Sequence, residues 1–310
     1  MGIAAAIPFF KHHQEEKDMA SDIYGFKSEL LLGISVDGGE REKSLELRKS
    51  SSVTETILAN ENYRGNHPFQ WMGRLISSLI ERIGEHEVYE EFRASKFRKV
   101  PKAVLAIPMR DVDFVFFLSH MHTHGNTLDM GKHRCSECRK NDLIEADLST
   151  LKVKRSEEDM SSEFGVQLRT GFLREAGSNP QENLPYMGKV WNKYFFRPVT
   201  LGDHIRHEEY YSPNNRVNFN MRVIGDALVR VESWGEVDGV WHKLADLEEG
   251  SMQMEGMELV DSLDSADRGL IRGAFARLPH LDFMYTHECN HCSSDMKLDV
   301  DPTNFHPMVK

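Results

Sequence analysis

All four cysteines of the 310-residue chain lie in two short stretches that share the pattern H-x-C-x-x-C. HRCSEC contains Cys135 and Cys138, and HECNHC contains Cys289 and Cys292, so the two copies are 154 residues apart. In a reducing compartment, paired CxxC motifs indicate metal binding or redox chemistry more than structural disulfides. Together the two pairs supply four thiolates, which is the complement of a tetrahedral all-cysteine zinc site.

One CxxC pair cannot close such a site, because a structural zinc ion takes four ligands. The simplest arrangement is one Zn²⁺ shared by all four cysteines, which would clamp two distant parts of the chain together. The alternative is two separate sites, each completed by histidine, with His133, His287 and His291 as candidates. Reduced cysteines without a metal are the third possibility. A redox role is disfavoured, because a thioredoxin-type CxxC begins a helix, whereas alternating apolar residues predict a strand after each pair here.

The segments that precede the two cysteine pairs follow a similar order. Each series begins with strand-like alternation: ELLLGISV and SLELR around a turn at 37–39, then EFGVQLRT and KYFFRPV later in the chain. An amphipathic helix is predicted over 71–87 and again over 220–236. MRDVDFVFFLSHM and SLDSADRGLIRGAF then place Asp113 and Asp267 at the same offset of 154 as the cysteines. Chance explains any one match, but five in order, at offsets of 148 to 154, favour a duplication.

The sequence therefore predicts an α+β fold of two related halves, each a β-hairpin plus helices and a CxxC zinc knuckle. The predicted parts are an N-terminal arm over 1–27, a first half over 28–153, a charged linker over 154–163 and a second half over 164–310. A methionine-rich stretch at 252–257 interrupts the second half, and we interpret it as flexible core or as a partner surface.

Composition and charge narrow the class of protein. Apolar residues make up 40% of the chain and charged residues 28%, which is typical of a soluble globular protein. The net charge of −11 would repel a phosphate backbone, so non-specific nucleic-acid binding is disfavoured. No apolar run approaches the roughly 18–20 residues of a membrane-spanning helix, and the apolar start MGIAAAIPFF lacks the basic residues of a signal peptide.

A second candidate site is the stretch SHMHTHGNTLD. It places His120, His122 and His124 at alternate positions, hence on one face if the segment is extended. The spacing matches the beginning of the HxHxDH motif of metallo-β-lactamase-type hydrolases, but the Asp-His that completes the motif is missing. Polar surface or subunit contact is the favoured interpretation. The chain contains no P-loop, no GxGxxG after a strand and no GxSxG, so we expect a protein that is not an enzyme.

The order of these features resembles the baseplate hub and hub-assembly proteins of contractile-tailed, T-even-like bacteriophages. The resemblance lies in YFFRPVTLGDHI, the helix after it, LDSADRGLIRGAF and CNHCSSDMKLDVDPTNFHP, mainly within 164–308 and more faintly over 28–153. Members often end with CxxC, a short strand and an Asp-Pro/Phe-rich tail, matched here by Cys289, Cys292, Asp301, Pro302, Phe305 and Pro307. The chain lacks the LPS-x-G turn that many members carry, and NLPYMG replaces it only in part, so hub component and assembly chaperone both stay open.

The resemblance implies a structural or assembly role in building a tail baseplate, stabilised here by zinc and carried out through contacts with other phage tail or baseplate proteins. The expected location is the host cytoplasm during assembly, or the tail baseplate of the virion. The alternative from another class is a zinc-ribbon nucleic-acid-binding or regulatory protein. The acidic net charge disfavours that alternative. A nucleic-acid-binding face would also carry several basic residues, whereas HECNHCSSDMKLD carries one basic residue other than histidine.

Overall fold

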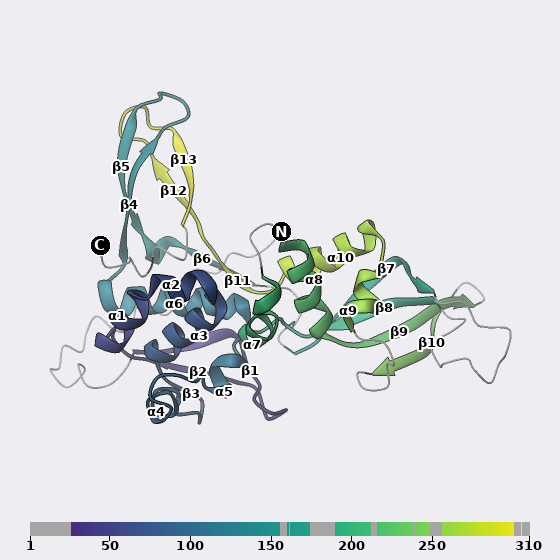
Figure 1. Cartoon of the computed structure of the whole chain (residues 1–310). Coiled ribbons are helices and arrows are strands. Elements are labelled where there is room, and N and C mark those ends of the chain that lie inside the picture. Colours follow the sequence, from purple (N-terminus) through teal and green to yellow (C-terminus); the bar gives the residue numbers. More distant parts are fainter. Residues whose placement is uncertain are drawn as a thin grey trace. The chain divides into compact units, whose positions relative to one another are not determined.

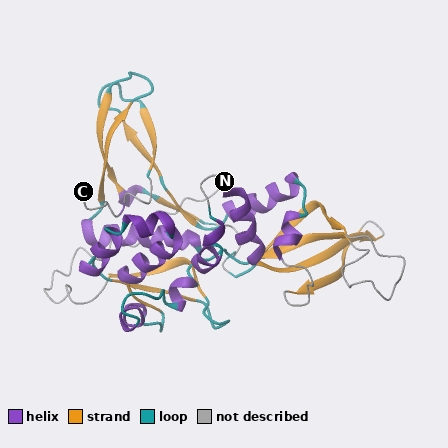
Figure 2. Ribbon diagram, in the orientation of Figure 1, coloured by secondary structure: helices purple, strands orange, loops and turns teal. Residues whose placement is uncertain are grey.

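The computed structural model describes residues 26–155, 160, 162–173, 190–211, 216–237, 240–248, 256–300 and 305. They form a mixed α+β fold, as the sequence predicts (Figure 2). The chain divides into two compact units: the first contains Met1–Arg155 and Pro279–Lys310, and the second contains Ser156–Leu278. The second unit starts within the predicted linker, but residues 279–310, predicted to belong to the second half, lie with the first unit. The physical reason is that the hairpin they form packs against the hairpin of the first CxxC pair.

The main body of the first unit is a three-stranded antiparallel sheet with helices packed on it (Figure 1). Its order is β1-β2-β3, formed by β1 (Phe26–Ile34), β2 (Glu42–Leu47) and β3 (Ile80–Ile83). The helices are α1 (Ser52–Leu58), α2 (Glu61–Asn66), α3 (Pro68–Leu79), α4 (Val88–Ala94), α5 (Lys102–Leu105) and α6 (Met109–His124). Leu32 and Leu47 of the sheet and Phe117 of α6 are fully buried, so the core lies between the sheet and the helices.

Two β-hairpins rise from this body and carry the cysteines at their tips (Figure 1). The first pairs β4 (Thr127–Arg134) with β5 (Asn141–Asp147), and the second pairs β12 (Met284–Glu288) with β13 (Asp295–Asp299). At their base, β6 (Lys152–Lys154) pairs with β11 (His280–Asp282). The predicted strands after each CxxC pair are thus present, and each also has a strand before it.

The second unit is a four-stranded antiparallel sheet of order β10-β9-β8-β7. Its strands are β7 (Phe164–Leu173), β8 (Val190–Phe196), β9 (Leu228–Val237) and β10 (Val240–Glu248). Its helices are α7 (Leu201–Arg206), α8 (Arg216–Asp226), α9 (Gly256–Asp261) and α10 (Ser265–Ala276). Phe275 of α10 packs edge-on against Phe164 and Phe196, at 5.0 and 5.5 Å between ring centroids, which fixes the helix on one face of the sheet.

A buried aspartate in the first turn of a helix fastens that helix to a strand in each unit. Asp111 of α6 accepts the backbone amides of 31–33 in β1 at 2.7 to 3.2 Å. Asp267 of α10 accepts those of 169–171 in β7 at 2.7 to 3.1 Å. The glycine that closes each run of amides has a φ of +79° or +68°, a conformation that favours glycine. The sequence analysis matched Asp113 with Asp267, whereas Asp111 is the residue that makes the contacts similar to those of Asp267.

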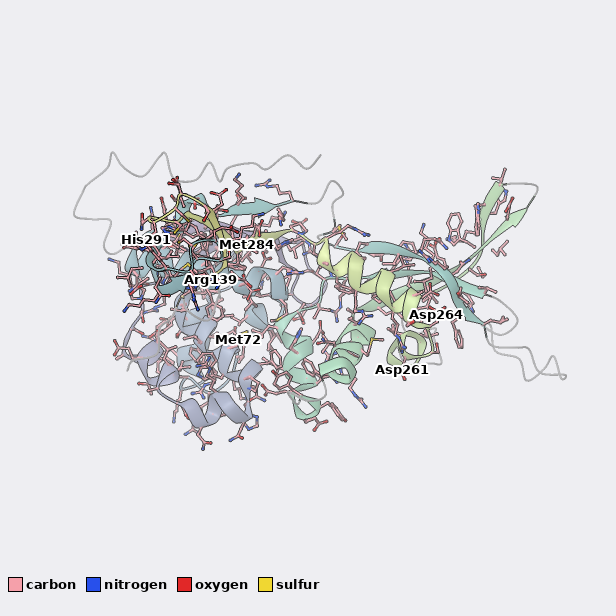
Figure 3. The ribbon with its side chains drawn as sticks, turned by 90° about the horizontal axis from the view of Figure 1, so that it is seen from above. Met72, Arg139, Asp261, Asp264, Met284 and His291 are labelled. Atoms are coloured by element: carbon pink, nitrogen blue, oxygen red, sulfur yellow. The ribbon has the colours of Figure 1, made fainter. Side chains whose placement is uncertain are left out.

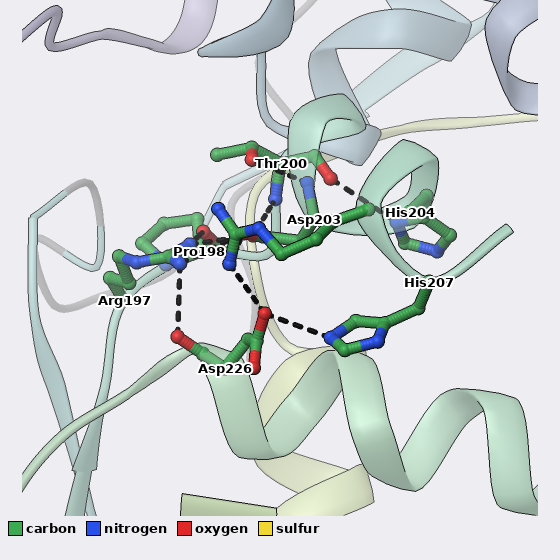
Figure 4. Close-up of polar contacts among 8 residues, drawn as sticks. Arg197, Pro198, Thr200, Asp203, His204, His207 and Asp226 are labelled. Atoms are coloured by element: carbon green, nitrogen blue, oxygen red, sulfur yellow. Dashed lines mark hydrogen bonds and ion pairs between the residues drawn. The ribbon is translucent and has the colours of Figure 1, made fainter.

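The connection between β8 and α7 is fixed by a network of charged groups (Figure 4). Thr200 and Asp203 form a capping box at the start of α7, and Nη1 and Nη2 of Arg197 donate to the Asp203 carboxylate at 2.6 and 2.9 Å. Burial raises the pKa of Asp203, but Arg197 and Thr200 outweigh it and hold that pKa below its ordinary value. The Asp226 carboxylate at the end of α8 lies 2.8 Å from Nε2 of His207, and this contact joins α8 to the same connection.

Three sequence predictions need correction. The helices predicted over 71–87 and 220–236 stop at Leu79 and Asp226, and β3 and β9 follow. Short apolar runs fit both helical and strand periods, and here pairing with β2 and β8 selects the strand. The histidine-rich segment is the end of helix α6 and not an extended strand, so His120 and His124 lie one turn apart, with ring centroids 5.1 Å from each other, and His122 lies on another face of the helix. Most of the N-terminal arm and of the methionine-rich stretch lies outside the described residues.

Candidate metal centre

Each CxxC pair forms a tight turn with the same backbone hydrogen bonds. The Cys135 amide donates to the Lys140 carbonyl at 2.9 Å, and the Arg139 amide donates to the Cys135 carbonyl at 3.0 Å. In the second hairpin, the amides of Cys289 and Ser293 donate to the carbonyls of Ser294 and Cys289, both at 2.9 Å. Arg139 and Ser293 have φ values of +61° and +57°, so the chain reverses through the left-handed region at the same place in both turns.

The two turns bring the four thiols into one cluster. Their sulfur atoms all lie within 4.8 Å of one another, and two sulfur pairs between the hairpins, Cys135–Cys292 and Cys138–Cys289, are 3.7 Å apart. A zinc ion with Zn–S bonds of about 2.3 Å separates the sulfurs of a regular tetrahedron by about 3.8 Å. The cluster therefore has the dimensions of one four-sulfur metal site. The sequence-predicted set of Cys135, Cys138, Cys289 and Cys292 is brought together in full.

The hydrogen-bond donors around the sulfurs favour thiolates at two positions. The Ser294 hydroxyl lies 3.2 Å from the sulfur of Cys135 and 3.0 Å from that of Cys292. With the amides of Cys138 and Glu137 it lowers the pKa of Cys135 to about 6, and it also lowers the pKa of Cys292. At Cys138 the amide of Lys140 lowers the pKa, but burial and the neighbouring thiols outweigh it and raise the pKa to about 11. Without a cation, the Cys138 thiol thus resists ionisation beside its neighbours.

Side chains below the sulfurs hold the two hairpins against each other. Ile144 and Met296 are buried with Cys135 and Cys289 in a small apolar cluster, to which Met130, Tyr285 and Leu298 add contacts. Beside it, buried Asp142 of β5 accepts the backbone amide of Asn290 at 2.9 Å and its side-chain amide at 2.8 Å. The same carboxylate lies 3.1 Å from Nε2 of His287, and these donors hold the pKa of Asp142 well below its usual range.

The histidines suggested as ligands of separate sites have other partners. Nε2 of His133 lies 3.0 Å from the Met130 carbonyl oxygen, His287 contacts Asp142, and Nε2 of His291 lies 3.3 Å from the Asn141 carbonyl oxygen. Arg139 and His291 mark the two turns in Figure 3. Among the described residues, the four cysteines are the one group of three or more metal-ligating side chains of this kind. The geometry thus favours a single shared site over two.

The second candidate site has a structural explanation. His120 is buried in α6, with Nδ1 2.7 Å from the Phe305 carbonyl oxygen and Nε2 3.1 Å from the Thr127 carbonyl oxygen. Its ring also packs against Phe305 at 5.6 Å between centroids. His120 therefore connects the helix to the beginning of β4 and to Phe305, and polar surface was the wrong interpretation for this residue.

Sequence reasoning missed the residues that support the cysteines. Asp142 and Asn290 contact each other only across the two hairpins, and no local pattern indicates such a pair. Ser294 follows the second CxxC pair by two residues, at the position of Lys140 in the first turn. A small hydroxylic residue just behind a CxxC pair is thus the one signal that could have been recognised.

Comparison with protein-family models, with curated proteins and with solved structures finds no match for this chain. Among the described residues, no helix has both the length and the apolar character needed to cross a membrane.

Proposed function

We propose that Cys135, Cys138, Cys289 and Cys292 hold one zinc ion in a structural site. The observation that carries this proposal is the approach of all four sulfurs to within 4.8 Å. Zn²⁺ neutralises the charge of several adjacent thiolates, and tetrahedral sulfur coordination is characteristic of zinc or iron. Four protein ligands leave no open coordination position, which is typical of structural and not of catalytic zinc.

The ion would hold together hairpins that have few other contacts. Beside the sulfurs, the described residues of the two hairpins meet in the small apolar cluster around Ile144 and Met296, in the polar contacts of Asp142, and where His291 approaches the Asn141 carbonyl oxygen. Binding of zinc by a site of this type supplies folding free energy directly, on the order of 10 kcal/mol in small zinc domains. We expect the two hairpins to separate when the metal is removed.

We also infer that the chain arose from two related modules, in which a strand pair, helices and a cysteine hairpin follow in the same order. Four parallels support this inference. Asp111 and Asp267 each accept three consecutive backbone amides of a strand, and the two CxxC turns make the same backbone hydrogen bonds. The amides of Arg48 and Arg197 both donate at 2.9 Å to the carbonyl of a residue just before β3 or β9. A capping box follows each arginine.

The biological role that we propose is assembly of a bacteriophage contractile-tail baseplate, by contacts with other tail proteins in the host cytoplasm or in the baseplate itself. The resemblance over 164–308 supports this role, and a closed structural metal site agrees with a protein that acts by binding. The alternative nucleic-acid role has one observation in its favour, because Lys132, Arg134, Arg139 and Lys140 are exposed on the first hairpin.

Metal content tests the site. Elemental analysis of the purified chain should find one zinc per molecule. Cys135→Ser and Cys289→Ser should each lose the metal and destabilise the hairpins, and the double variant should lose little more, because each single change already opens the shared site. Ser136→Ala, an exposed change in the same turn, is the matched control. Two zinc ions with additive losses would indicate separate sites, and a metal-free, fully stable protein would refute both.

Co-purification tests the role. Tagged chain, isolated from cells that also express the products of its neighbouring genes, should retain at least one tail or baseplate protein among them. Cys289→Ser should lose that partner if the hairpins present the contact. Specific binding of DNA or RNA that is abolished by changing Arg139 and Lys140 to alanine, without retention of a tail protein, would favour the zinc-ribbon alternative instead.

A further inference from the structure

The first cysteine hairpin carries a cluster of basic side chains near its tip. The exposed members are Lys132, Arg134, Arg139 and Lys140, which we call the tip cations. None of the tip cations forms an ion pair with another residue in the described part of the chain. By contrast, the side chain of Lys102 is 70% exposed, yet its ammonium group lies 2.8 Å from the Asp37 carboxylate. In a chain of net charge −11, the tip cations are a surface available to an anionic partner.

The second hairpin shows that a CxxC turn folds without these charges. Its turn makes the same backbone hydrogen bonds as the first. At the offset of 154 residues, the positions of the tip cations are occupied by Thr286, Glu288, Ser293 and Ser294. None of these is basic, so the tip cations are not a requirement of the turn or of the sulfur cluster. They distinguish the first hairpin from the second.

The outer face of the first hairpin changes character between its tip and its base. The register of β4 on β5 places Lys132 opposite Leu143, and it places Asp129 opposite Glu145 nearer the base. All four side chains are exposed, and directly opposite residues share a face of the ladder. Leu143 is 68% exposed, the highest value among the large apolar side chains of the described chain. The face therefore has cations at its tip, an exposed leucine beside them and carboxylates at its base.

This arrangement suits an acidic protein segment better than a nucleic acid. A nucleic-acid strand laid along the hairpin would meet the repelling carboxylates of Asp129 and Glu145, and Leu143 would find no apolar contact on a phosphate backbone. Residues 127–147 also include no Phe, Tyr or Trp on which an unpaired base could stack. A short acidic peptide can end before the two carboxylates and place an apolar side chain against Leu143.

We propose that the outer face of the first hairpin, near its tip, binds an acidic segment of another protein. Carboxylates of that segment contact the tip cations, and an apolar side chain of the segment covers Leu143. Complementary charge of this kind sets the choice and orientation of a partner, and the apolar contact adds affinity. This inference rests on the proposed function, in which the chain acts by binding other proteins, and it names the chemistry of the partner.

Fluorescence anisotropy with the purified full chain tests the inference. The probe is a labelled peptide of Glu-Glu-Leu repeats, compared with a peptide of Glu-Glu-Ser repeats and with an oligothymidylate of equal charge. In salt of about 0.15 M, charges more than about 8 Å apart are largely screened, so binding reports the local cluster and not the net charge. The Glu-Glu-Leu peptide should bind most tightly. Lys132→Glu and Leu143→Ser should each weaken its binding by about fivefold.

The matched control is Lys297→Glu, which makes the same change of charge at an exposed position of the second hairpin and should leave peptide binding unchanged. Arg134 is kept in every variant, because its Nε donates to the Arg139 carbonyl oxygen at 3.0 Å and so supports the turn. Tighter binding of the oligothymidylate, equal binding of the two peptides, or an equal loss with Lys297→Glu would overturn the inference.

Two further measurements separate this inference from the proposed function. Zinc content is measured on the same samples: a zinc-loaded chain that does not bind the peptide would overturn the inference and leave the metal site standing. A metal-free chain that binds the peptide would do the reverse. Peptide binding by a chain that retains no tail protein on co-purification would support the acidic-segment surface and overturn the baseplate role.

Discussion

Asp142 gives the sharpest test of how the two cysteine hairpins are held together. It is the one buried acidic residue of its hairpin within the described chain, and its carboxylate receives three hydrogen-bond contacts from the other hairpin. We consider the replacement Asp142→Asn, which keeps the size of the side chain and removes its charge. One oxygen remains for the side-chain amide of Asn290. The new NH₂ group takes the place of the second oxygen, which accepts the backbone amide of Asn290 and lies beside Nε2 of His287. An NH₂ group cannot accept either hydrogen bond.

The expected loss follows from these contacts. Two hydrogen bonds to a charged acceptor are removed, and each contributes about 1.5–3 kcal/mol. The His287 side chain retains 17% exposure, so part of its contact is screened by water. We therefore expect Asp142→Asn to lower the free energy of unfolding by about 2–4 kcal/mol. Glu145→Gln, on the same strand but exposed, should change it by less than about 0.5 kcal/mol.

Denaturant unfolding of wild type and both variants measures these differences, and the rate of zinc transfer to a chelator gives a second readout. The pH dependence has a defined sign. Because the folded pKa of Asp142 is depressed, its contribution is complete above the unfolded value of about 3.9 and is lost as pH falls below it. The gap between wild type and Asp142→Asn should therefore narrow between about pH 5 and pH 2. If Asp142→Asn were as stable as Glu145→Gln and released zinc at the same rate, the reasoning would be refuted.

Three further outcomes are expected. Asp267→Asn should destabilise the second unit by about 2–4 kcal/mol in denaturant unfolding, because a buried carboxylate with three amide donors loses charge and one acceptor; exposed Asp261→Asn should not. Gly171→Ala should be destabilising, since its Cβ would lie 2.3 Å from a backbone oxygen at a φ of +68°, and an unchanged melting temperature would contradict this. His120→Leu should expose Phe305 to chymotrypsin, whereas His124→Leu, a change at an exposed position of the same helix, should leave it protected.

The sequence was most informative where a local pattern has one physical solution. The alternation after each CxxC pair has a period of two and appears as β5 and β13. The predicted ends of helices were wrong where one apolar pattern fits both a helix and a strand. Ile80 and Ile83 continue the apolar stripe of α3, yet they form β3, because β2 offers a pairing edge that the sequence of 71–87 does not reveal.

The supporting residues of the metal centre were beyond sequence reasoning for a different reason. The sulfur ligands share a spacing, so they can be recognised one by one. Asp142 and Asn290 act only as a pair and are 148 residues apart, and Asp142 stands in a strand whose other acidic residues are exposed. The same applies to Asp111: a carboxylate that accepts three strand amides has no sequence signature, and Asp113, two residues later, fitted the repeat equally well.

The long separation of the two CxxC pairs does not imply that zinc must close a long loop. β6 and β11 pair at the base of the hairpins, with Val153 opposite Leu281 and Lys154 bridged to Asp282 at 2.9 Å. This ladder joins the points at which the chain leaves and re-enters the first unit, so the 123 residues of Ser156–Leu278 are already enclosed before a metal binds. What remains open are the short paths from the ladder to each CxxC turn, and closing short paths costs little conformational entropy. The stabilisation by zinc should thus come from the metal–sulfur bonds, and it should be almost independent of whether the second unit is folded.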